Sequence, residues 1–176
     1  MEKIFYTPVN TYPNSETAIK RVFERFFHLK NVDIFRNENG KPFLNATTAQ
    51  NPLFFSVSHT NETLFIAVCD ENVGIDAEIK NRQVAYASIV KKFNQEERAS
   101  IHSPVHFLQY WTVKEATVKW LGGKLATDLA KLSYLNGEIF YQNLPLPVQI
   151  TLLDFQNSIL AVCSERDFSN AEFTPF

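Results

Sequence analysis

Two acidic residues lie two positions apart in the stretch Val73-Gly-Ile-Asp-Ala-Glu78. In a β-strand the side chains of residues i and i+2 leave the same face, so Asp76 and Glu78 point the same way, roughly 6–7 Å apart along the strand. Like charges at this spacing repel one another unless a positive group lies between them. The pair is either the solvated end of a strand or part of a cation site, and this stretch alone does not separate the two interpretations.

A third acidic residue lies on a helix predicted for Val105–Leu121. Trp111, Glu115 and Lys119 are spaced four residues apart, which places them on one face of that helix. The simplest interpretation is a surface ion pair between Glu115 and Lys119, worth a few tenths of a kcal/mol.

The functional interpretation joins Glu115 to Asp76 and Glu78. Three carboxylates, completed by water and phosphate oxygens, form a suitable site for Mg²⁺. Lys119 and His59 would then compensate the phosphate charge that the metal leaves. The sequence has no Gly-x4-Gly-Lys-Ser/Thr loop, which excludes a Walker-type phosphate site.

The composition is that of a globular protein. Hydrophobic residues make up 45% of the 176 residues, and 16 phenylalanines supply a large aromatic core. A net charge of −2 argues against general binding to nucleic acid or to an anionic membrane, so an anionic ligand requires a local cluster of positive residues.

The chain carries two cysteines, Cys69 and Cys163, each in an apolar stretch. We expect two buried free thiols rather than a disulfide or a metal site. Residues 1–8 lack the apolar segment of a signal peptide, and no apolar run approaches membrane-spanning length, so we expect a cytoplasmic protein.

Local patterns predict an alternation of helices and short strands. The first part of the chain is predicted to contain the following elements: strand Ile4–Tyr6, helix Ala18–Leu29 capped by Asn14 or Ser15, strand Val32–Arg36, turn Asn37–Pro42, and strands Leu53–His59, Leu64–Cys69 and Val73–Ile79. The short connections between the last three strands predict antiparallel neighbours.

The second part repeats this order. It is predicted to contain helix Arg82–Phe93, a short helix opened by a capping box at Asn94–Glu97 and broken by Pro104, helix Val105–Leu121 ending at Gly122-Gly123, strands Leu132–Leu135 and Glu138–Tyr141 around Asn136-Gly137, strands Val148–Phe155 and Ile159–Cys163, and a loosely held tail after Glu165. The fold class is therefore α+β, with residues 1–176 as one unit of two halves, 1–80 and 81–165, and a tail, 166–176.

Five stretches of this sequence resemble the 4′-phosphopantetheinyl transferase superfamily. In chain order they are Gly40-Lys-Pro42, Phe55-Ser-Val-Ser-His59, Val73-Gly-Ile-Asp-Ala-Glu78, Phe93-Asn-Gln-Glu-Glu97 and Trp111-Thr-Val-Lys-Glu-Ala-Thr-Val-Lys119. Each stretch is weak alone, but Gly-Ile-Asp-x-Glu followed by Trp-x-x-Lys-Glu-Ala-x-x-Lys is highly specific. The length and the apparent duplication resemble the monomeric, surfactin-synthetase-activator type, whose pseudo-duplicated fold has a small antiparallel sheet and a long helix in each half.

The resemblance implies a reaction and its partners. Phosphopantetheine would pass from coenzyme A to a serine of an acyl or peptidyl carrier protein in fatty acid, polyketide or nonribosomal peptide biosynthesis, releasing 3′,5′-ADP. The carrier would approach over Arg82–Phe93, where Lys91 and Lys92 suit an acidic partner.

The resemblance also assigns residues. Asp76, Glu78 and Glu115 would bind Mg²⁺, with Mn²⁺ as an alternative, and Glu115 would accept the serine proton. The catalytic set would be Asp76, Glu115 and Lys119. Coenzyme A would be held by a further set of residues in the cleft between the halves: Lys41, Pro42, Ser58, His59 and Lys119.

Two alternative functions remain open at this stage. The same acidic residues would serve another Mg²⁺-dependent phosphotransferase or phosphohydrolase, which coenzyme A binding would distinguish. The chain could instead be a weakly active partner that binds carrier proteins, which a transfer assay would distinguish.

Overall fold

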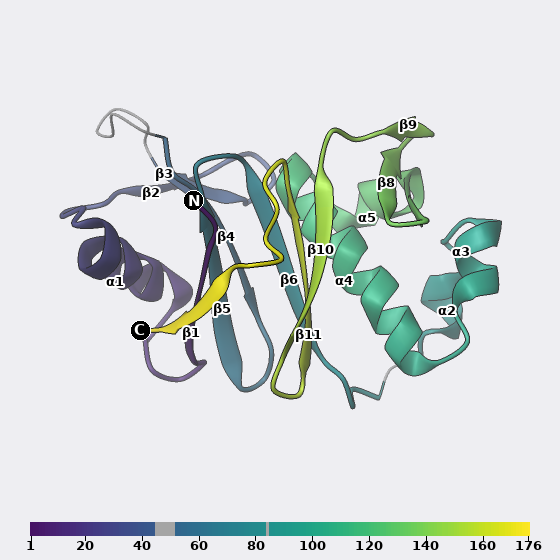
Figure 1. The fold of residues 1–176 in the computed structure, drawn as a ribbon, viewed down its shortest axis with the longest axis horizontal. Coiled ribbons are helices and arrows are strands. Elements are labelled where there is room, and N and C mark those ends of the chain that lie inside the picture. Colours follow the sequence, from purple (N-terminus) through teal and green to yellow (C-terminus); the bar gives the residue numbers. More distant parts are fainter. Residues whose placement is uncertain (45–51, 84) are drawn as a thin grey trace.

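The computed structural model describes residues 1–44, 52–83 and 85–176. Its strands form two main sheets that lie between helices α1 (Ser15–Phe27) and α4 (Pro104–Leu121), as Figure 1 shows. Short helices α2 (Ala87–Val90) and α3 (Gln95–Ser100) lie beyond α4. The expected α+β class is confirmed.

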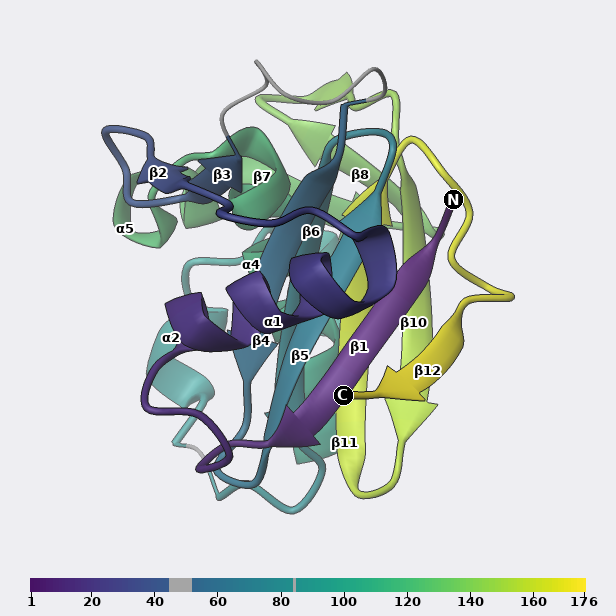
Figure 2. The same ribbon diagram turned by 90° about the vertical axis from the view of Figure 1, so that its left-hand side faces the viewer.

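The first main sheet has the strand order β12-β1-β5-β4 and is covered by α1 (Figure 2). Its strands are β1 (Lys3–Pro8), β4 (Phe54–His59), β5 (Thr63–Cys69) and β12 (Glu172–Pro175). Asn14 caps α1, because its side chain accepts a hydrogen bond from the Thr17 amide at 2.9 Å. Phe23 of α1 packs with Phe5 of β1 and Ile66 of β5 in a core layer between helix and sheet.

The second main sheet has the order β10-β11-β6 and is antiparallel throughout. Its strands are β6 (Val73–Ile79), β10 (Gln149–Phe155) and β11 (Ser158–Ser164). The side chains of β6 alternate, so Ile75 joins the core between the two sheets, whereas Gly74 faces α4.

The remaining elements are short. They are the hairpin of β2 (Ile34–Arg36) and β3 (Pro42–Leu44), helix α5 (Leu125–Asp128), and the three-stranded sheet of β7 (Leu132–Leu135), β8 (Glu138–Tyr141) and β9 (Leu144–Pro145). The predicted capping box at Asn94 and the predicted turn at Asn136-Gly137, where both residues have positive φ, are confirmed. Both cysteines are free and buried, as expected.

The prediction that β5 and β6 pair as antiparallel neighbours is wrong. β5 already has β1 on one side and β4 on the other, so it has no free edge for β6. β6 pairs with β11 instead. On its other edge, the hydroxyl oxygens of Ser56 and Ser58 accept hydrogen bonds from the amides of Ile75 and Ala77, each at 3.1 Å. Serine side chains of β4 thus replace a backbone ladder and join the two sheets.

The helix predicted for Arg82–Phe93 is mostly absent from the described residues. Only Ala87–Val90 is helical, and the predicted span includes residue 84, which lies outside the described residues. Tyr86 precedes the helix without providing a side-chain cap. The apolar spacing reflects packing instead, because Tyr86 stacks on the buried ring of Phe107 and Ile89 packs against the same buried cluster.

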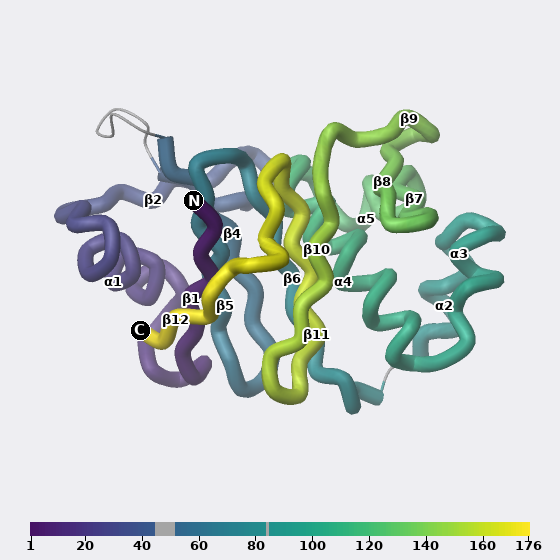
Figure 3. The backbone as a smooth tube through the Cα atoms, in the orientation of Figure 1, coloured from purple at the N-terminus to yellow at the C-terminus, as the bar shows by residue number. Residues whose placement is uncertain are grey.

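The prediction of a loosely held tail after Glu165 is also wrong. β12 pairs in parallel with β1, and Phe168 is fully buried between the main sheets. Figure 3 shows the chain returning from β11 to lie beside its own beginning. All other strand pairs between described residues are antiparallel.

The division into halves 1–80 and 81–165 stays a prediction. Each main sheet carries one long helix on its outer face, α1 or α4. β6 precedes residue 80, yet its backbone bonds run to β11, so the two parts of the chain share this sheet. Within the described residues, we find no helix with the length and apolar character needed to cross a membrane.

Candidate active site

A cleft of about 720 Å³ opens where the ends of β4 and β6 meet the C-terminal half of α4. All three predicted acidic residues and the predicted Lys119 line it, with Asp76 and Glu78 from β6 and Glu115 and Lys119 from α4. The other described lining residues are Val57, Ser58, His59, Thr60, Asn61, Ala77, Ile79, Asn81, Arg82 and Gln83. The structure therefore brings together the two stretches in which the sequence showed acidic residues.

Gly74 allows α4 to lie against β6. A Cβ atom at this position would lie 2.0 Å from the carbonyl oxygen of Ala116 and 2.6 Å from the amide nitrogen of Trp120. Both are backbone atoms that cannot rotate away, so only glycine permits this approach. The contact sets the height at which Glu115 and Lys119 meet the acidic residues of the strand.

Asp76 is 5% exposed and only one of its oxygens is occupied. Oδ1 accepts hydrogen bonds from the Ser58 hydroxyl at 2.9 Å and from the Lys119 ammonium at 2.8 Å. Oδ2 is buried without a hydrogen-bond partner among the described residues. A buried carboxylate oxygen without a partner is costly, because it has lost its hydration. The carboxylates of Asp76, Glu78 and Glu115, which line one cleft, and this unpartnered oxygen fit a divalent cation.

Glu115 faces Asp76 from the helix and is partly buried. Burial, and next the negative charge of Asp76, raise the pKa of Glu115 to about 7, against the opposing effect of the Lys119 ammonium. A carboxylate with a pKa near neutrality can accept and release a proton at physiological pH.

Glu78 forms an ion pair with Arg82, which follows β6 in the chain. The Glu78 side chain is 14% exposed, and the Arg82 side chain is 52% exposed. The half-exposed guanidinium of Arg82 thus lines the cleft and holds the carboxylate of Glu78.

The predicted coenzyme A residues fall into two groups. Ser58 and His59 line the cleft, with Ser58 buried against Asp76. Lys41 and Pro42 do not line it. Lys41 donates hydrogen bonds to the Asn72 side chain at 2.6 Å and to the carbonyl of Trp120 at 3.2 Å, and burial lowers its pKa to about 8.

Sequence reasoning missed the two loops of the cleft, at Thr60–Asn61 and Asn81–Gln83. The available signal for these loops was their position in the chain, since each directly follows a strand that ends in predicted site residues.

Sequence reasoning also missed the role of Lys114. Its ammonium is fully buried and donates to Glu97 at 2.8 Å and to the carbonyl of Leu132 at 2.6 Å. This pair links the stretch beginning at Phe93 to the stretch beginning at Trp111.

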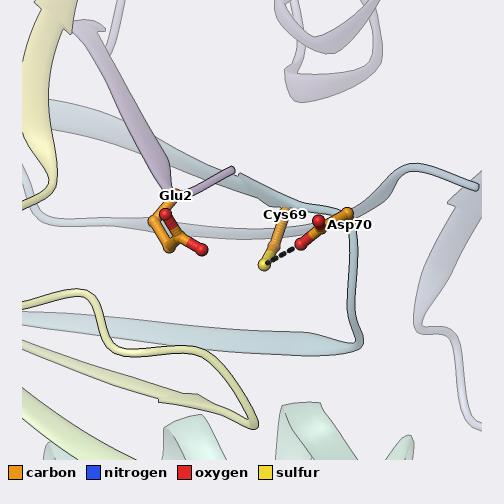
Figure 4. Close-up of side chains that lie close together, drawn as sticks. All are labelled: Glu2, Cys69 and Asp70. Carbon is orange, nitrogen blue, oxygen red and sulfur yellow. Dashed lines mark hydrogen bonds between the residues drawn. The ribbon is translucent and has the colours of Figure 1, made fainter. Parts of the chain in front are cut away.

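A different cluster of acidic and thiol groups lies near the N-terminus (Figure 4). In the described part of the chain, Glu2, Cys69 and Asp70 bring their ligand atoms within 4.8 Å of one another. Asp70 also accepts hydrogen bonds from the Met1 ammonium at 3.3 Å and from Arg166 at 3.2 Å, and burial raises the pKa of the Cys69 thiol. These contacts suit a structural role, because they connect the N-terminus and the end of β5 to the C-terminal segment.

Comparison with known proteins identifies the family. Residues 72–163, just over half of the chain, match the model of the 4′-phosphopantetheinyl transferase superfamily. The chain belongs to this superfamily. The match contains all four of Asp76, Glu78, Glu115 and Lys119, and membership makes the protein a transferase.

Curated relatives agree with this assignment. The 4′-phosphopantetheinyl transferase AcpT of Salmonella typhi is 29% identical over 140 residues, which cover 75% of this chain and 67% of that protein. AcpT of Escherichia coli O157:H7 is 27% identical over 146 residues, covering 78% and 68%. The 4′-phosphopantetheinyl transferase gsp of Aneurinibacillus migulanus is 26% identical over 115 residues, covering 61% and 46%.

Proposed function

We propose that this protein transfers the 4′-phosphopantetheine group of coenzyme A to a serine of an acyl or peptidyl carrier protein and uses Mg²⁺, with Mn²⁺ as an alternative. Superfamily membership and the names of the relatives support the reaction. A cytoplasmic location and a monomeric state stay predictions from the sequence.

The observation that carries the proposal is the free oxygen of Asp76. Its Oδ2 atom is buried without a partner among the described residues, while Glu115 and Glu78 lie in the same cleft. Asp76, Glu78 and Glu115 are accordingly the proposed ligands of the metal. When bound, Mg²⁺ supplies a positive charge that stabilises the diphosphate in the transition state.

The proposed transfer breaks one P–O bond and forms another. The serine Oγ bonds to the phosphorus that carries the pantetheine, and the bond from that phosphorus to the bridging diphosphate oxygen breaks. The bridging oxygen leaves with the electron pair as part of 3′,5′-ADP. The serine proton passes to Glu115, directly or through water.

The remaining residues position the substrate in this proposal. Lys119 is anchored by the carbonyl of Ile75 at 2.9 Å and by Asp76, so its charge is already fixed where phosphates would bind. His59, at the exposed end of β4, is proposed to hold the nucleotide end of coenzyme A. Roles for Lys41 and Pro42 in that binding stay predictions from the resemblance.

Substitution of the acidic residues tests the function. We expect Asp76→Ala and Glu115→Ala to abolish transfer of a fluorescent pantetheine group to a carrier protein, because each variant removes one proposed ligand and one negative charge. Glu78→Ala should be milder, since water can replace a single ligand of Mg²⁺. Near-normal turnover of either severe variant at saturating Mg²⁺ would show that the metal assignment is wrong.

The carrier is proposed to dock over residues 82–93. Lys91 and Lys92 are exposed there, next to the partly buried apolar residues around α2. We expect Lys91→Glu combined with Lys92→Glu to raise KM for an acidic carrier at low salt, with KM for coenzyme A unchanged. An unchanged carrier KM would exclude this docking surface.

A further inference from the structure

Two cations and three carboxylates share the cleft among its described lining residues. The two cations are held very differently. Lys119 is fixed by two acceptors, the carbonyl of Ile75 and Oδ1 of Asp76. The side chain of Arg82 pairs with Glu78, lies on the loop after β6, and is more than half exposed. Arg82 is therefore the cation that can move at small cost.

We propose that Arg82 occupies Glu78 in the ligand-free protein as a substitute for the divalent cation, and moves to the phosphates of the substrate when the metal binds. This inference rests on the proposed function. The inference gives Arg82 two opposite effects. Arg82 weakens binding of the metal and strengthens binding of the anionic ligand.

Competition follows from the contact between Arg82 and Glu78. The guanidinium occupies an oxygen of Glu78. A divalent cation that takes this carboxylate must break that ion pair. The pair is half exposed on its Arg82 side, so the need to break it lowers metal affinity only modestly, by about two- to fivefold.

Assistance follows from charge and geometry. With Glu78 bound to a metal, Arg82 still lies at the rim of the cleft and has lost its partner. Its planar fork of N–H donors matches phosphate oxygens in pairs, which a lysine ammonium does not. The diphosphate and the 3′-phosphate of coenzyme A are the negative groups that such a fork would bind.

The first arm of the test uses Mg²⁺ alone. Isothermal titration of the nucleotide-free protein should show that Arg82→Gln binds Mg²⁺ about two- to fivefold more tightly than the wild type. The matched control is Lys80→Gln. Lys80 pairs with Asp154 at 2.9 Å and does not line the cleft, so this control removes an equal charge nearby. Its Mg²⁺ affinity should stay within about twofold of the wild type.

The second arm uses 3′,5′-ADP at saturating Mg²⁺. Arg82→Gln should bind this nucleotide about tenfold more weakly, since it loses hydrogen bonds to a charged group. Arg82→Lys keeps the charge without the fork. It should bind Mg²⁺ like the wild type and 3′,5′-ADP with an intermediate affinity.

The two arms separate the outcomes. Tighter Mg²⁺ binding together with weaker nucleotide binding supports the inference. Unchanged or weaker Mg²⁺ binding in Arg82→Gln, with normal binding by the wild type, overturns the inference and leaves the proposed function standing. Weakening of both ligands with a lower melting temperature indicates a merely structural role and also overturns it. A wild type that binds neither Mg²⁺ nor 3′,5′-ADP overturns the proposed function itself.

Discussion

Asp76 has one oxygen committed to the protein and one oxygen open. Ser58 and Lys119 hold Oδ1, which fixes the plane of the carboxylate before any ligand arrives. Oδ2 meets no partner in the described structure. A side chain held in this way loses little freedom on binding, which is how a rigid support improves a metal or substrate site.

At the scale of one residue, the raised pKa of Glu115 predicts how the free energy of unfolding depends on pH. Its folded-state pKa of about 7 lies above the ordinary value of 4.5, so the folded state prefers the protonated form. The stability that this preference contributes is complete below about pH 4.5 and is lost as the pH rises through 7. In EDTA, Glu115→Gln should therefore be more stable than the wild type at pH 8, by on the order of 1–3 kcal/mol, and the difference should shrink toward pH 5.

Denaturant unfolding at pH 5, 6, 7 and 8 measures this difference. Glu62→Gln is the matched control, because Glu62 lies exposed in the turn between β4 and β5. A gap between wild type and Glu115→Gln that stays constant from pH 5 to pH 8 would contradict the assignment.

At the scale of elements, the packing of α4 on β6 depends on the absence of a side chain at Gly74. Gly74→Ala would place a methyl group against the backbone of Ala116 and Trp120 and force the helix away from the strand. We expect a loss of about 3 kcal/mol or more in the free energy of unfolding. Transfer activity should fall further than stability explains, since Lys119 would move from Asp76.

Gly137→Ala is the control for this substitution. Gly137 has a positive φ of 85° but no atom near the added Cβ, so only backbone strain remains, costing about 1 kcal/mol. If chemical denaturation gave the two alanine variants equal stabilities, the close approach of α4 and β6 would not be what fixes the site.

Local signals made α1, α4 and the turn at Asn136-Gly137 predictable from the sequence. Each has a cap or turn residue whose effect extends over only a few neighbours, such as Asn14 at the start of α1 or Gly122 in the left-handed conformation after α4. The acidic residues of the site were predictable for a similar reason, since spacings of two and four residues fix a face.

The partners of strands and of buried charges were not predictable in the same way. β5 and β6 are close in sequence, but β5 has no free edge, because β4 lies on one side of it and β1, from the start of the chain, lies on the other. Lys114 lies one residue before Glu115, yet its partner Glu97 belongs to a separate short helix. The contact of Arg82 with Glu78 required the path of a loop that the sequence had suggested was helical.

At the scale of the whole molecule, the C-terminal segment is part of the core. Phe168 is fully buried between the main sheets with Phe65 and Leu160. We expect Phe168→Ala to cost about 3–5 kcal/mol, because it removes a large side chain from a packed interior. Thermal and denaturant unfolding measure the loss.

Leu144→Ala provides the comparison for that loss. Leu144 is 70% exposed, so its truncation should change stability by less than about 0.5 kcal/mol. Equal stabilities of the two variants would mean that the segment after residue 165 does not support the core.

The pairing of β6 with β11 also sets when β6 can gain its backbone partner during synthesis. The paired residues differ in number by 79, for Ile79 and Ser158, up to 91, for Val73 and Ser164. A ribosome adds roughly 5–20 residues per second, so β6 waits about 4–18 seconds for its partner strand during synthesis. Through that interval β6, which carries Asp76 and Glu78, has one edge without its backbone partner. A nascent chain therefore cannot complete the sheet that holds this strand until residues 158–164 have been translated.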